Sequence, residues 1–238
     1  MSTPTVLVHE SFNDPHAELW FAEPAGFTAV PMETLLSEPG SPGAENLRTA
    51  AAPLLATAHD ASDRRQFIER IASAQKLLGA LRDVGTVHCS IGLHRDDGEG
   101  PDDSDALPLF SLFTISWLET SVAPRGITAA RAVTSTPGHS RIEFVELPCG
   151  PGTFSESTVA PAPESELPQQ PLLQLHAHLP HPDNKRLAVL TLSTGAVVRR
   201  AEYRVVLRRI AETVRFENPL ECGAGSGRRG AGRVGTRS

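Results

Sequence analysis

Alternation of apolar and polar residues predicts two β-strands, over residues 86–95 and 172–179, that each have one apolar and one polar face. Small and aliphatic side chains occupy one face of these strands, at Val87, Cys89, Ile91, Leu93, Leu173, Leu175, Ala177 and Leu179. Histidines occupy the opposite face, at His88, His94, His176 and His178. We therefore expect the aliphatic side chains to be sealed beneath helices and the imidazoles to remain in contact with solvent.

Further strands follow from the same kind of pattern. Residues 107–120 are apolar on both faces, which is typical of a central strand. Residues 141–147 and 186–194 have the composition and length of strands and are bounded by turn residues. Residues 17–31 are expected to form an early hairpin of two short strands around the Pro-Ala-Gly turn at 24–26.

Apolar residues at spacings of three and four predict the helices. The clearest helix covers residues 60–82 and ends at Gly85, and a closing helix covers residues 198–216. A further helix over residues 44–58 would form an αα-hairpin with the helix of residues 60–82, laid against the sheet. Residues 126–135 fit a helix or a strand equally well.

The order of these elements predicts one α+β domain over residues 17–218, an antiparallel sheet flanked by helices. Residues 1–16 are expected to form a flexible N-terminal arm. Residues 149–168 are rich in proline, serine and glutamate and are expected to form a mobile excursion. Residues 219–238 read as a disordered tail rich in glycine and arginine.

Charge and composition narrow the function classes. The net charge is −6, and residues 221–238 carry four arginines against one glutamate, so residues 1–220 carry −9. An acidic body argues against nucleic acid as a partner, because phosphate contacts require a basic surface. The N-terminal residues lack the pattern of a signal peptide, no apolar run approaches the roughly 20 residues of a membrane span, and the three cysteines show no metal-site spacing. These features predict a reduced, soluble, cytoplasmic protein.

Motifs for catalysis or cofactor binding are missing from the sequence. It contains no Gly-x-Ser-x-Gly, no P-loop and no His-Glu-x-x-His. The glycines at 225, 227 and 230 have dinucleotide-motif spacing but follow the end of a helix, so they do not form such a site. The acidic loop 96–106 lacks the closing glutamate of a calcium loop. We therefore expect no cofactor and a protein that is not an enzyme.

The four histidines on the polar strand faces leave one alternative open. His-x-His on a strand places two rings on one side about 7 Å apart, which suits zinc or copper if further ligands arrive. If the two strands are near neighbours, His88, His94, His176 and His178 would share one surface as candidate metal ligands. The alternative function is therefore a metal-binding protein or metal-dependent enzyme.

The last 50 residues resemble the Mog1/PsbP-like α/β/α sandwich family, which includes the actinobacterial LpqN-type proteins. The matching positions are Leu190–Thr194, Tyr203, Ile210, Ala211, Val214 and Phe216. The resemblance implies an α/β/α sandwich and a binding or adaptor role, and it carries no catalytic residue. The expected function is therefore that of a non-enzymatic binding or accessory protein whose partner is another protein. The expected contact surface is the polar face with the four histidines, or the long helix of residues 60–82.

Overall fold

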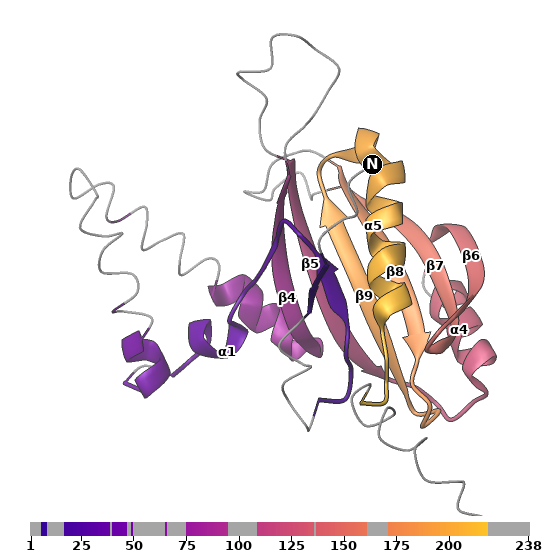
Figure 1. Ribbon diagram of the computed structural model, residues 1–238, viewed down its shortest axis with the longest axis horizontal. Coiled ribbons are helices and arrows are strands. Elements are labelled where there is room, and N and C mark those ends of the chain that lie inside the picture. Colours follow the sequence, from indigo (N-terminus) through magenta and orange to yellow (C-terminus); the bar gives the residue numbers. More distant parts are fainter. Residues whose placement is uncertain are drawn as a thin grey trace, which may run out of the picture.

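A seven-stranded antiparallel sheet forms the centre of the computed structural model, with the strand order β3-β4-β5-β9-β8-β7-β6 (Figure 1). The structure describes residues 6–8, 17–38, 40–46, 49, 65, 75–94, 109–135, 137–160 and 171–218. The strands of this sheet are β3 (Phe27–Ala29), β4 (Thr86–His94), β5 (Leu109–Glu119), β6 (Ser140–Leu147), β7 (Gly150–Val159), β8 (Leu172–Pro180) and β9 (Arg186–Thr194).

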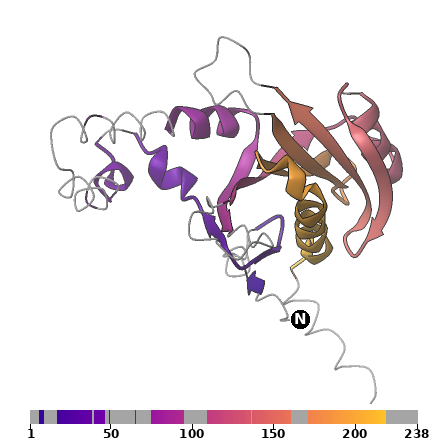
Figure 2. The same cartoon turned by 90° about the horizontal axis from the view of Figure 1, so that it is seen from above.

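Helices cover both faces of this sheet (Figure 2). Helix α5 (Arg200–Thr213), preceded by the short 3-10 helix η3 (Val197–Arg199), packs on one face over β8 and β9. Helix α4 (Arg125–Thr134) packs on the opposite face over β7 and β8. The α+β class predicted from the sequence is confirmed. The segment 126–135, which fitted either structure, is helical up to Thr134.

The main core lies between α5 and the sheet. The helix buries Tyr203, Leu207 and Ile210 at spacings of three and four, as the amphipathic pattern predicts. The facing strands contribute aliphatic side chains that are almost completely buried, at Leu173, Leu175, Ala177, Leu179, Ala188, Leu190 and Leu192. The alternation in β8 therefore predicts correctly which of its side chains enter this core.

A second, smaller core lies on the other face at the β4 end of the sheet. Helix 75–83 packs there through Leu78 against Cys89 of β4 and Met32 of α1 (Met32–Leu35). This helix ends before Gly85, as predicted. Helix 75–83 and α4 thus cover opposite ends of one face, and β5 and β9 lie between them (Figure 2).

The N-terminal strands differ from the expected hairpin. Strands β2 (Ala22–Pro24) and β3 lie on either side of the predicted turn, but β2 pairs with β1 (Val6–Val8) and β3 pairs with β4. Strand β1 also lies within residues 1–16, which were expected to form a loose arm. This short strand forms through backbone pairing with β2, and no pattern in its local sequence predicts it.

The segment 149–168 corrects a second expectation. Its first part forms β7, a central strand that pairs with β6 on one side and β8 on the other. Glycine, proline and serine suggested a mobile segment, but hydrogen bonding on both sides overrides these weak local preferences. The register of β6 and β7 shifts between Ser140 and Glu143, and Arg141 in this irregular stretch has a φ of 48°.

Several predicted segments fall outside the described residues. These are most of the helices 44–58 and 60–82, the acidic loop 96–106 and the tail 219–238. Among the described residues, no helix is long and apolar enough to cross a membrane.

Gly85 gives a direct test of the turn between helix 75–83 and β4. Its φ is +85°, and a Cβ placed there would lie 2.4 Å from the backbone oxygen of Trp117. We expect Gly85→Ala to lower the free energy of unfolding, measured in urea titrations, by about 1–3 kcal/mol or more. The positive φ is unfavourable for alanine, and the added Cβ would clash with the Trp117 backbone oxygen. Gly126→Ala is the matched control, since an added Cβ there meets nothing within 4 Å. Equal effects of the two changes would contradict the expectation.

Candidate binding sites on the two faces of the sheet

The structure does not bring the four predicted histidines together. Strands β4 and β8 are separated by β5 and β9. His88 pairs with Ile115 on the face covered by α5, whereas His176 and His178 lie on the face covered by α4. His94 ends β4 opposite Leu109. The expected shared surface is therefore wrong.

His88 is buried rather than solvated, with 9% of its surface exposed. Its Nε2 lies 2.7 Å from Oε1 of Glu23, which also accepts a hydrogen bond of 2.8 Å from Ser90 Oγ. The ring stacks edge-on against Phe21 at a centroid distance of 4.9 Å. Glu23 is 65 residues away in the sequence and satisfies the ring inside the core, which the local pattern of β4 does not reveal.

His176 and His178 meet a third imidazole that the sequence analysis missed. His139, just before β6, lies with its ring centroid 5.2 Å from that of His176 and 5.6 Å from that of His178. The hydroxyl of Ser155 joins His139 Nδ1 at 3.0 Å and His178 Nε2 at 3.3 Å. His176 is held between the hydroxyls of Ser157, at 3.0 Å, and Thr191, at 3.1 Å.

These imidazoles line a cavity of about 570 Å³, here called the histidine pocket. It lies over β5, β9 and β8, between α4 and the end of helix 75–83 at Val84. The expectation that the imidazoles remain in contact with solvent is wrong for His178 as well, because only 5% of its surface is exposed. Burial, together with the smaller effect of the neighbouring imidazoles, lowers the pKa of His176 to about 4 and that of His178 to about 3.

The described residues contain no group of three or more His, Cys, Asp or Glu that could hold a metal ion. Both ring nitrogens of His176 are already engaged by hydroxyl groups. The ring of His139 packs edge to face against the rings of His176 and His178, with interplanar angles of 81° and 83°. The geometry therefore gives the metal-binding alternative no support.

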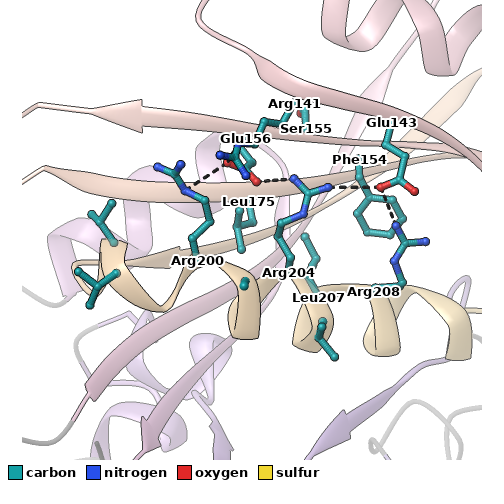
Figure 3. A pocket seen from close by; sticks show the side chains of 14 residues that line it. Arg141, Glu143, Phe154, Ser155, Glu156, Leu175, Arg200, Arg204, Leu207 and Arg208 are labelled. Carbon is teal, nitrogen blue, oxygen red and sulfur yellow. Dashed lines mark hydrogen bonds and ion pairs between the residues drawn. The ribbon is translucent and has the colours of Figure 1, made fainter. Parts of the chain in front are cut away.

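A second cavity lies on the opposite face, between α5 and the strands β6 and β7 (Figure 3). Its volume is about 730 Å³, and we call it the arginine groove. Arg200, Arg204 and Arg208 project into it from successive turns of α5, because residues four apart share one side of a helix. Arg141 reaches it from the irregular stretch of β6.

Two glutamates face these arginines. Glu156 of β7 is almost completely buried, and its carboxylate accepts a hydrogen bond from Arg204 and lies 3.3 Å from Arg200 Nε and 3.7 Å from Arg141 Nε. Glu143 of β6 accepts hydrogen bonds from Arg208, at 2.7 Å, and Arg204, at 3.3 Å (Figure 3). Multiple guanidinium partners offset the cost of burying the Glu156 carboxylate.

The arginine groove combines charge with apolar surface. Four arginines against two glutamates leave an excess of two positive charges among its lining residues. Val198 and Val205, which also line the groove, are 91% and 49% exposed. The sequence analysis missed this groove, although the spacing of the arginines at 200, 204 and 208 is visible in the sequence.

The described residues form an α+β protein with a seven-stranded main sheet, and the two cavities described above lie on opposite faces of that sheet. Comparison with family models, with curated proteins and with solved structures finds no match for the chain.

Proposed function

We propose that this protein is a non-enzymatic binding or accessory protein, and that its arginine groove receives an acidic, partly apolar segment of another protein. The observation that carries the proposal is the excess of two positive charges around a groove with exposed valines. Arginine is enriched at protein interfaces because its planar guanidinium forms paired hydrogen bonds with carboxylates. A segment that alternates acidic and aliphatic side chains would match both components.

The arrangement of the arginines supports binding rather than structure alone. Glu156 engages mainly Arg204 and Arg200, and Glu143 engages Arg208. Arg141 is 62% exposed in its side chain and lies 3.7 Å from Glu156, too far for a strong hydrogen bond. Its guanidinium can therefore take up a carboxylate from a partner at little cost to the fold.

Two further points agree with this proposal. The resemblance of the C-terminal residues to the Mog1/PsbP-like family implies a binding or adaptor role, and we retain that assignment as part of the proposal. The thiols of Cys89 and Cys149 are free, which fits the reducing cytoplasm as the location of the protein.

The test is a fluorescence anisotropy titration with a labelled peptide of alternating glutamate and leucine. We expect the protein to bind this peptide and to bind a lysine–leucine peptide at least about tenfold more weakly. Affinity should also fall as salt is raised, because exposed ion pairs are screened. The double variant Arg141→Gln/Arg208→Gln should weaken binding by about tenfold or more.

The matched control for these variants is Arg209→Gln on the same helix. Arg209 is exposed but does not line the groove. Its loss should leave the affinity for the acidic peptide nearly unchanged. Equal binding of the two peptides, or an equal effect of Arg209→Gln, would overturn the proposal.

A further inference from the structure

Three residues that line the histidine pocket each carry a buried polar atom that has no hydrogen-bond partner in the described part of the chain. They are Oγ1 of Thr120 after β5, Oγ1 of Thr128 in α4 and Nδ1 of His178 in β8. All three residues line the same cavity, although they come from three different elements. A buried polar atom without a hydrogen bond destabilises a fold, so its retention requires an explanation.

The imidazoles of the pocket are already held in place by hydroxyl groups. Ser155 joins His139 to His178, and His176 is fixed between Ser157 and Thr191. Because these hydroxyls orient the rings, the unsatisfied Nδ1 of His178 has a defined direction before any ligand binds. A site organised in advance avoids part of the ordering cost of binding.

The chemistry of the lining indicates an uncharged ligand. Burial lowers the pKa of His176 and His178 well below neutrality, so both rings are neutral at pH 7. The lining contains one arginine and one glutamate, Arg131 and Glu119, whose charges balance. Aliphatic residues complete the wall, at Val84, Leu118, Leu187 and Val189.

We propose that the histidine pocket binds a small uncharged molecule that carries both hydrogen-bond donors and acceptors, held by Thr120, Thr128 and His178. The cavity volume of about 570 Å³ falls within the usual range for small-molecule sites. Hydroxyl groups can donate or accept, and the free nitrogen of a neutral imidazole accepts or donates according to its tautomer. A sugar-like polyol and a neutral heterocycle share this chemistry.

The experiment uses the full chain with ¹⁵N-labelled histidine. The uncharged probes are glucose, myo-inositol, uridine and adenosine, and each has a phosphorylated counterpart as the charged control. We expect at least one uncharged probe to shift the ring signals of His178 with a dissociation constant below about 1 mM, and its phosphorylated counterpart to bind at least tenfold more weakly. Glucose and myo-inositol test whether the ligand is a polyol, and uridine and adenosine test whether it is a neutral heterocycle.

The variant Thr128→Val separates a ligand role from a packing role. It removes the unsatisfied hydroxyl at nearly constant volume, so we expect an unchanged or higher melting temperature together with at least about tenfold weaker binding of the probe. Thr134→Val on the same helix is the control, because Thr134 is exposed and its hydroxyl bonds to Ala130. No shift of His178 with any probe, equal binding of charged counterparts, or equal effects of the two variants would overturn the proposal.

Discussion

We expect Leu190→Ala to lower the free energy of unfolding by about 2–5 kcal/mol, one of the two largest effects predicted for this protein. Leu190 lies in the central strand β9, is completely buried, and pairs with Ile115 on one side and Ala177 on the other. Helix α5 covers it in the same core. Neighbours held by a paired sheet cannot collapse fully into the space left by the missing methyl groups, so transfer and cavity terms add.

Urea titrations followed by circular dichroism measure this effect. Val122→Ala is the control, because Val122 is 73% exposed and its truncation should change the free energy of unfolding by less than about 0.5 kcal/mol. If Leu190→Ala lost no more than the control, the placement of the core between α5 and β9 would be wrong.

The second large effect is a loss of stability in mild acid. His176 and His178 have folded-state pKa values lowered to about 4 and about 3, below the ordinary value of 6.5 that applies in the unfolded chain. Between these values the unfolded state binds more protons, so stability falls as the pH drops below 6.5. By pH 5 we expect a loss of up to about 2 kcal/mol per histidine relative to neutral pH.

Unfolding free energies measured from about pH 7.5 to pH 5 test this expectation. The variant His176→Gln/His178→Gln should lose most of the pH dependence in this range, whatever its absolute stability. His139 also lines the pocket and remains in the variant, and burial lowers its pKa as well, so it contributes to any residual slope. An unchanged slope would show that the two imidazoles are already charged or solvated in the folded protein.

The part of the fold governed by side-chain alternation could be predicted from the sequence. Strands β8 and β9 and helix α5 follow from the pattern because their apolar residues face one continuous core. Strand β7 could not be predicted, because its stability comes from pairing with β6 and β8 and its composition favours loops. The partners of β2 and β3 depend likewise on contacts distant in the sequence.

The candidate sites show the same division. The proximity of His176 and His178 follows from their spacing in one strand. The burial of His88 does not, because it depends on Glu23 from a strand early in the chain. His139 reaches the pocket only through the pairing of β6, β7 and β8. The spacing of the arginines on α5 could have predicted a basic strip along one side of the helix. The cavity that this strip lines becomes apparent only from the glutamates that face it.

The irregular backbone at Arg141 also affects how the molecule behaves toward other copies of itself. Among the described strands, β6 has a neighbour only on the side of β7, and Ile142 and Phe144 on it are 42% and 61% exposed. Such an edge is a template for edge-to-edge association and aggregation. The left-handed conformation of Arg141 interrupts the ladder of unpaired amides, so an incoming strand would find no continuous register. The bend that carries the Arg141 guanidinium to Glu156 thus also protects the sheet against uncontrolled growth.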